Sequence, residues 1–115
     1  MRRDYSNIDK QKALEFVRVD PFVLEDLNDE LKNDLDVVSL AVSIKPYTFG
    51  SASEALRNNP ELAISAIRAN YNTARYLGSQ LKKNPMFLKD ACRINSKVVD
   101  FIEDRNIKEQ VLKAS

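Results

Sequence analysis

Hydrophobic and polar positions along this chain repeat with a period of 25 residues. The repeat is clearest from Asn59 to Pro85, a stretch that opens and closes on the same Asn-Pro pair. Each copy begins with a residue suited to the N-cap of a helix, and these residues are Asp9, Asp34, Asn59 and Asn84. The pattern predicts four structural units, at residues 9–33, 34–58, 59–83 and 84–108.

Each unit is typical of two short helices joined by a turn. In the third unit the side chain of Asn59 can accept from free amides of the first turn, and Pro60 suits the first helical position. Apolar residues at helical spacing continue to Ala69. Residues 70–72 break the pattern, and their two asparagines predict a left-handed turn. A second apolar stripe then ends at Leu81, before two lysines that suit a helix C-terminus.

The units align in apolar columns. In the first helix the columns are Phe16, Ala41, Ala66 and Ala91; Val17, Val42, Ile67 and Cys92; and Val19, Ile44, Ala69 and Ile94. In the second they are Leu24, Phe49, Ala74 and Val99; Leu27, Ala52, Leu77 and Ile102; and Leu31, Leu56 and Leu81. Helices of about ten residues are marginal alone, so each unit must bury its stripe against its neighbours.

We therefore predict an all-α fold, an array of about four short helical hairpins that forms a compact α-solenoid or bundle. One helical-repeat domain is expected over residues 1–115, with tails at 1–8 and 109–115. An alternative for the second tail is that Val111 and Leu112 extend the last helix. Asn106 breaks the final apolar column, and Ile107 is its expected replacement.

Several stretches match a known repeat family. The second unit contains Asn33-Asp34-Leu35-Asp36-Val37-Val38, then Ala41-Val42, then Ser53-Glu54-Ala55-Leu56-Arg57-Asn58. In these stretches, and at Ala66-Ile67, Asn70 and Tyr76-Leu77, the chain resembles the repeats of the family catalogued as domain of unknown function 4116. The resemblance covers about residues 9–107. It implies a helical repeat, found in multiple copies in bacterial and large-virus proteins, with no assigned activity and no catalytic residues. The turn glycine of those repeats is replaced here by Pro21, Pro46, Tyr71 and Ser96.

The composition argues against an enzyme. The chain has no histidine, which removes the commonest general base and metal ligand. Its one cysteine, Cys92, stands in an apolar column and is expected to act as a small hydrophobic residue. Gly50 and Gly78 are too far apart to build a phosphate-binding loop and are expected to permit close packing instead. We expect no catalytic residue, no cofactor and no metal site.

A carboxylate- or metal-dependent enzyme is the weakest alternative. Residues 25–30 hold the acidic side chains Glu25, Asp26, Asp29 and Glu30. This cluster lacks the glycine and the closing glutamate of a calcium loop. On a helix Asp26 and Glu30 would share a face, and solvated carboxylates are the favoured explanation of the cluster.

Tyrosine and arginine near the turns mark a candidate protein-binding surface. These residue types are enriched at the hot spots of protein interfaces. The candidate partner-binding residues are Tyr47, Arg68, Tyr71, Arg75 and Tyr76. The alternative is that the tyrosine rings only shield the ends of the hairpins. We expect a non-enzymatic protein-protein interaction module, in one form a regulator or effector-type protein that masks a partner surface.

The charge distribution keeps a nucleic-acid-binding alternative open. The net charge of +1 is the sum of −4 over residues 1–36, +4 over residues 37–85 and +1 over residues 86–115. Basic side chains of the middle units could contact phosphates while tyrosines stack on bases. A pI of about 7.8 is low for this class of protein. Another protein is therefore the favoured partner, and no small-molecule substrate is evident.

The expected location is the cytoplasm. The start of the chain has no apolar segment of a signal peptide, and no stretch reaches the length of a membrane span. Secretion by a route without a signal peptide stays open. A single cysteine excludes a disulfide within the chain.

Overall fold

The computed structural model describes residues 7–113, and its regular structure in this range is entirely helical. Each unit has a ten-residue α-helix, a six-residue 3₁₀-helix and a short closing α-helix. The long helices are α1 (Lys10–Val19), α3 (Leu35–Ile44), α5 (Pro60–Ala69) and α7 (Pro85–Ile94). The 3₁₀-helices are η1 (Pro21–Asp26), η2 (Pro46–Ser51), η3 (Tyr71–Tyr76) and η4 (Ser96–Phe101). The closing helices are α2 (Asp29–Lys32), α4 (Glu54–Arg57), α6 (Ser79–Lys82) and, longer, α8 (Arg105–Lys113).

The four N-cap residues are confirmed. The side chain of each accepts a hydrogen bond from a backbone N–H two or three residues further on, at 2.8 to 3.2 Å. These residues are Asp9, Asp34, Asn59 and Asn84. The 25-residue period of the sequence is therefore the period of the helices.

The second half of each unit differs from the expected α-helix. It starts as a 3₁₀-helix, as in η3, where the N–H of Thr73 donates to the carbonyl of Asn70 (3.0 Å). The turn before it is not left-handed: Asn70 has φ −158°, and no residue among 7–113 has a positive φ. The Asn70 side chain accepts from the N–H of Asn72 (3.0 Å), so a capped extended residue makes the turn. The residue before each 3₁₀-helix is extended and no positive φ is needed, so the turn works without glycine, including before η2, where Lys45 makes no side-chain cap.

One predicted core column lies on the surface. Val19, Ile44 and Ala69, each ten residues after an N-cap, are exposed, whereas the fourth member, Ile94, is half-buried and packs against the core. The three exposed residues are the last residues of α1, α3 and α5 and lie at the border of the buried stripe, about 20° in helical rotation from the third position after the cap. Their exposure therefore follows from their place at the end of the helix and not from the opposite helical face. The third and fourth residues after the cap complete the buried stripe instead. In α3, α5 and α7 these are Val37, Val38, Leu62, Ala63, Phe87 and Leu88.

A further core column contains threonine and was not predicted. Its members are Val23, Thr48, Thr73 and Val98, all buried near the start of the 3₁₀-helices. The hydroxyl groups of Thr48 and Thr73 donate to the carbonyls of Lys45 and Asn70, both at 2.8 Å. Local hydrogen bonds to the backbone therefore allow a polar residue in this apolar column.

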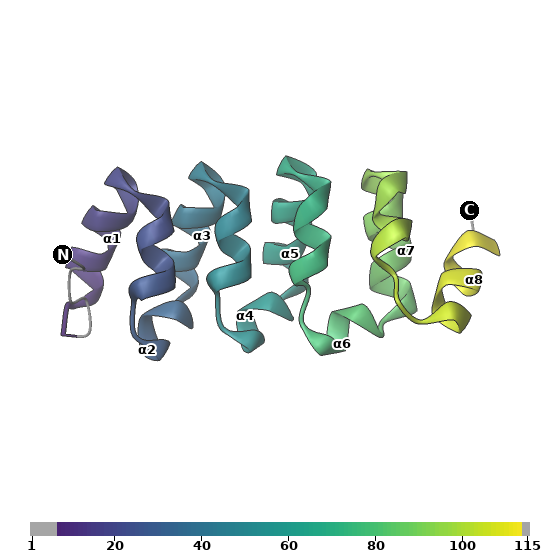
Figure 1. The fold of residues 1–115 in the computed structure, drawn as a ribbon, viewed down its shortest axis with the longest axis horizontal. Coiled ribbons are helices and arrows are strands. Elements are labelled where there is room, and N and C mark those ends of the chain that lie inside the picture. The colour runs from purple at the N-terminus through teal and green to yellow at the C-terminus, as the bar shows by residue number, and fades with distance from the viewer. Residues whose placement is uncertain (1–6, 114–115) are drawn as a thin grey trace.

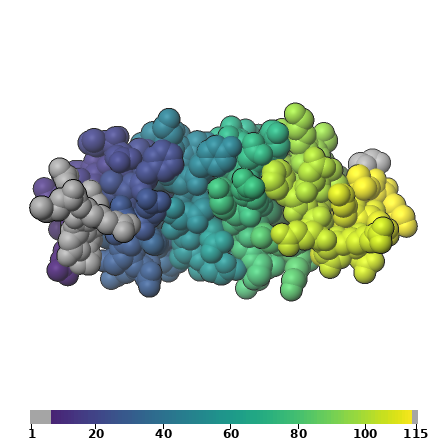
Figure 2. All heavy atoms as spheres, in the orientation of Figure 1, coloured from purple at the N-terminus to yellow at the C-terminus, as the bar shows by residue number. Residues whose placement is uncertain are grey.

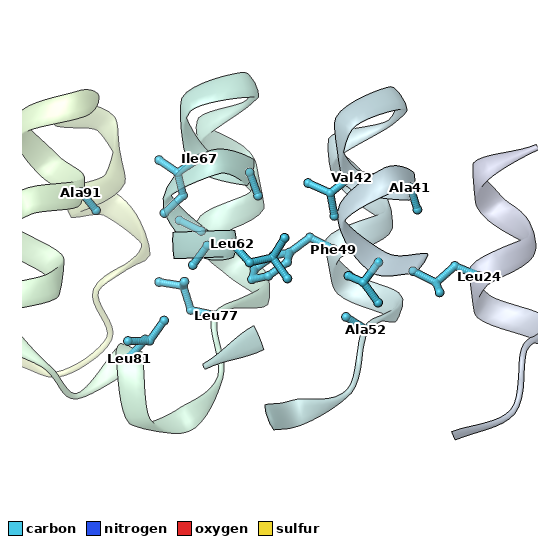
Figure 3. Packing of buried hydrophobic residues seen from close by; sticks show 14 of the residues in the cluster. Leu24, Ala41, Val42, Phe49, Ala52, Leu62, Ile67, Leu77, Leu81 and Ala91 are labelled. Carbon is cyan, nitrogen blue, oxygen red and sulfur yellow. The ribbon is translucent and has the colours of Figure 1, made fainter. Parts of the chain in front are cut away.

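The units stack into an elongated array of 49 × 24 × 20 Å. The long α-helices form one row and the 3₁₀-helices another, and members of each row contact their neighbours (Figure 1). The space-filling view shows an unbroken surface along the long axis (Figure 2). Phe49 of the second unit is fully buried and extends from η2 toward α5 of the third unit (Figure 3). Neighbouring units therefore share a core.

The tail expected at residues 109–115 is wrong for residues 109–113, and the alternative that Val111 and Leu112 extend the last helix is confirmed, because α8 continues to Lys113. After each of the first three closing helices, an Asp or Asn caps the next long helix, whereas Glu109 stands at the equivalent position of the fourth unit. Glutamate favours the helix interior, so the helix runs on. Ile107 replaces the missing Leu, and Val111 is buried as well. Residues 1–6 and 114–115 of the expected tails lie outside the described residues, and Ile8 packs against the core.

Candidate functional site

Each long α-helix passes into its 3₁₀-helix at the same edge of the array. This edge, which we call the junction edge, consists of residues 18–22, 43–47, 68–72 and 93–97. It runs along the top of Figure 1, while the closing helices α2, α4 and α6 lie along the bottom. Because the units repeat, equivalent positions of the junction edge form rows parallel to the long axis.

Apolar side chains are exposed on this edge at repeating positions. Val19 is 87% exposed and Ile44 is 42% exposed, at the last residue of α1 and α3. Phe22 and Tyr47, the second residues of η1 and η2, are 49% and 43% exposed. Single exposed apolar residues are ordinary, but these four recur in register on two neighbouring units.

The junction edge is also basic. Its residues carry five cations, at Arg18, Lys45, Arg68, Arg93 and Lys97, and one anion, Asp20, which gives a net charge of +4. The remaining residues of the chain therefore sum to −3. The opposite edge, residues 28–34, 53–59, 78–84 and 103–109, carries six cations and seven anions, a net charge of −1.

Most cations of the junction edge have no partner within the described chain. No ion pair involves Arg18, Lys45 or Arg68 among residues 7–113. Arg93 lies 3.5 Å from Asp90, but both side chains are about two-thirds exposed or more, so the pair is weak. Three of these cations also sit in the last turn of a long helix, where they complement the helix dipole. They remain available to an external anion.

Three of the five candidate residues lie on the junction edge. Tyr47 and Arg68 are exposed there. Tyr71 is half-buried: its ring packs against Phe101, with centroids 6.3 Å apart, and the Lys97 ammonium lies 5.3 Å from its centroid. The Lys97 ammonium is therefore within cation–π distance of a half-buried tyrosine ring.

The other two candidates lie at the far end of η3. Arg75 is exposed there, while Tyr76 is half-buried against the backbone of the preceding unit. A Cβ at Gly50 would come within 2.8 Å of the Tyr76 ring. The Tyr76 ring is therefore part of the contact between units, and the structure does not bring Arg75 and Tyr76 together with the junction edge.

The opposite edge is occupied by contacts between units. The backbone N–H and hydroxyl of Ser79 donate to Glu54 Oε1 at 2.9 and 3.1 Å, and Arg57 pairs with Glu54 Oε2 at 3.0 Å. These contacts, the Ser79 N–H first, hold the pKa of the Glu54 carboxyl below its usual range. Arg57 also donates to the carbonyls of Ala52 and Tyr76. These polar groups stabilise the stack rather than offer a free surface.

Three grooves extend over other parts of the surface, and two of them reach the junction edge, at Ser43 and Ala69 and at Arg93 and Ser96. One of about 340 Å³ lies between α3 and α5 and is lined by serines and small apolar residues. A mixed-charge groove of about 480 Å³ lies among Glu25, Asp29 and Glu54. A third, of about 350 Å³, lies between α7, η4 and α8 and includes Cys92, whose thiol pKa is raised by burial. No cluster of three or more potential metal ligands occurs in residues 7–113.

The acidic residues 25–30 do not lie on one helix, so the helical face expected to be shared by Asp26 and Glu30 does not form. Glu25 and Asp26 belong to η1, while Asp29 and Glu30 belong to α2. Leu27 and Asn28 separate the two elements.

Comparison with known proteins identifies part of the chain. The model of the family described as Domain of unknown function (DUF4116) matches residues 9–57, the first unit and nearly all of the second. No curated protein matches the chain, and no solved structure does. Within the described residues, none of the helices has the length and apolar character needed to span a membrane.

Proposed function

We propose that this chain, whose residues 9–57 form a DUF4116 domain, is a non-enzymatic protein-protein interaction module that binds its partner along the junction edge. The observation that carries the proposal is the repeated exposure of apolar side chains beside unpaired cations on that edge. The family description assigns no activity. The proposal therefore rests on the surface itself.

The junction edge suits binding because a rigid stack supports it. The residues beneath it, including Val17, Val42 and Thr73, are buried and fix the ends of the long helices. Little conformational entropy would then be lost when a partner covers Val19, Ile44 and their neighbours. Burying these side chains is favourable by roughly 25 cal/mol for each Å² of apolar area removed from water.

The opposite edge is a weaker candidate. Its charges nearly balance, and Glu54, Arg57 and Asn58 are already engaged in contacts between units. A partner binding there would have to compete with these contacts. Tyr76 and Arg75 extend the proposed surface only if the partner also reaches along η3.

Nucleic acid is the second candidate partner. The net charge of +4 on the junction edge and the exposed ring of Tyr47 favour it, since cations bind phosphates and tyrosine stacks on bases. Val19 and Ile44 favour a protein, because aliphatic side chains neither bind phosphate nor stack on bases.

The test compares two variants of the full chain that each lose exposed apolar side chains. The junction variant is Val19→Ser, Ile44→Ser and Tyr47→Ser. The control variant is Leu35→Ser and Met86→Ser, which removes apolar groups that are 49% and 79% exposed near the N-terminal ends of α3 and α7. Both variants are first checked for helix content and thermal unfolding. Each is then used as bait in crosslinking with mass spectrometry in the cells that produce the chain.

The proposal expects specific protein partners that the control variant keeps and the junction variant loses. Retention of every specific partner by the folded junction variant would show that the binding surface lies elsewhere. Capture that disappears after nuclease treatment would support nucleic acid instead.

A further inference from the structure

The chemistry of the junction edge also defines the partner. We infer that the partner presents an acidic, extended segment whose apolar side chains recur about every third residue, lying along the long axis of the array. This inference rests on the proposed function, because it assigns a chemical class to the partner of the same edge.

The charges require an acidic segment. The junction edge carries a net +4, and its cations occur on all four units: Arg18, Arg68 and Arg93 stand at equivalent positions, and Lys45 stands two residues after that position in the second unit. A segment with carboxylates distributed along its length would meet a cation at each unit. A basic segment would meet like charges at every unit, which opposes association.

The apolar rows require apolar side chains between those carboxylates. One row is formed by Val19, Ile44, Ala69 and Ile94, at the ends of the four long helices. Val19 and Ile44 are the most exposed of its large members, and Phe22 and Tyr47 extend the apolar surface toward the 3₁₀ row. A purely polar acidic segment would leave these side chains in water.

The spacing of the units sets the spacing on the partner. Packed helices lie about 8–10 Å apart, so equivalent positions of neighbouring units recur at about that distance. A segment in the extended polyproline II conformation advances about 3.1 Å per residue with three residues per turn, so about three residues cover one unit and every third side chain faces the array. A segment of roughly ten residues would then reach across all four units.

The same chemistry could attract an anionic membrane surface, because basic and apolar residues together also favour anionic lipid headgroups. The array favours the peptide. Its apolar residues form a row along one narrow edge and are most exposed on the first two units, whereas a membrane would contact a broad face.

The test is a selection of random dodecapeptides displayed on phage, carried out on the intact chain. The junction charge variant is Arg18→Glu, Arg68→Glu and Arg93→Glu. The control is Lys83→Glu, Arg105→Glu and Lys108→Glu, which makes the same change in net charge on the opposite edge. Enriched peptides are synthesised, and their affinities for the three proteins are measured by fluorescence anisotropy. Sedimentation with phosphatidylserine vesicles and with single-stranded RNA is measured in parallel.

The inference expects enriched peptides that are net acidic with apolar residues three apart. Their affinity should fall about tenfold or more in the junction charge variant and change less than about threefold in the control. Enrichment of neutral or basic peptides, or equal loss in both variants, would overturn the inference and leave a protein-binding function standing. No enrichment would also overturn it. No enrichment together with binding to vesicles or RNA would overturn the proposed function as well.

Discussion

The side chain of Asn58 occupies the space beside Gly78 that a side chain at position 78 would fill. A Cβ at Gly78 would overlap the Asn58 amide. Asn58 Oδ1 accepts from the N–H groups of Gln80 and Leu81, at 3.0 and 3.3 Å, and so caps α6 from the preceding unit. Ser53 is the residue of the second unit that corresponds to Gly78, and its hydroxyl caps its own helix, α4. One unit therefore supplies the cap that the next unit lacks.

This relationship predicts a coupled pair of substitutions. Asn58→Ala should lower the free energy of unfolding by roughly 1–2 kcal/mol, the usual cost of losing an N-cap. Gly78→Ala should destabilise the natural chain because of the overlap, and should cost clearly less when Asn58 is already alanine. Urea unfolding of the two single variants and the double variant measures the coupling. Gly78→Ser combined with Asn58→Ala restores the cap found in the second unit and should recover part of the loss. Additive costs for Asn58→Ala and Gly78→Ala would contradict the contact.

Two valines in α1 test which face of the helix is the core. Val17 is fully buried and Val19 is 87% exposed. Val17→Ala should lower the free energy of unfolding by roughly 2 kcal/mol or more. This is the sum of about 0.8 kcal/mol for each of the two lost methyl groups and the free energy of the cavity left behind. The free energy of unfolding of Val19→Ala should stay within about 0.5 kcal/mol of that of the natural chain. Chemical denaturation of both variants provides the comparison, and similar losses at the two sites would place the core face elsewhere.

The period, the caps and most core columns could be predicted because they depend on local chemistry. Asp9, Asp34, Asn59 and Asn84 act as caps through hydrogen bonds to residues two or three positions away. The 3₁₀ geometry could not be predicted, because an apolar stripe at spacings of three and four fits both kinds of helix. The column of Thr48 and Thr73 was missed because their hydroxyl bonds to the backbone are visible only in the fold.

Part of the candidate site could be located from the sequence, because residue type and position beside a turn are local features. Tyr47, Arg68 and Tyr71 were found from residue type and from their place beside a turn. Val19 and Ile44 were assigned to the core, because an apolar residue in a repeating column is usually buried. Helical angle does not identify this column as exposed, because the tenth position after each cap lies only about 20° from the buried third position. Its exposure depends on where the long helix ends, which only the fold shows.

Acid should weaken the contact between the second and third units. The pKa of Glu54 is held below its ordinary value of about 4.5, first by the N–H of Ser79 and then by its hydroxyl. The charged carboxylate therefore stabilises the fold above about pH 4.5, and this contribution disappears as pH falls through the lowered pKa. Glu54→Gln should lower the free energy of unfolding at pH 7 and converge on the natural chain at pH 3.

Urea unfolding of Glu54→Gln at several pH values measures this effect. Glu109→Gln is the control, since Glu109 has no ion pair among residues 7–113. A difference between Glu54→Gln and the natural chain that does not shrink in acid would contradict the assigned role of Glu54.

Cys92 should react slowly with thiol reagents. Burial raises the pKa of its thiol above the ordinary value of about 9.0, which lowers the thiolate fraction near neutral pH. Its reaction with Ellman's reagent at pH 8 should be slower than that of an unstructured cysteine peptide, and should reach the peptide's rate after unfolding in urea. A native rate equal to that of the peptide would mean that the groove around Cys92 leaves the thiol open.

The most direct test of the binding edge is a chemical-shift map of the intact, isotope-labelled chain, titrated with the strongest peptide from the display selection. The account expects the largest amide shifts within residues 18–22, 43–47, 68–72 and 93–97, and small shifts in α2, α4 and α6. Shifts concentrated on those three closing helices, with the junction edge unchanged, would contradict it.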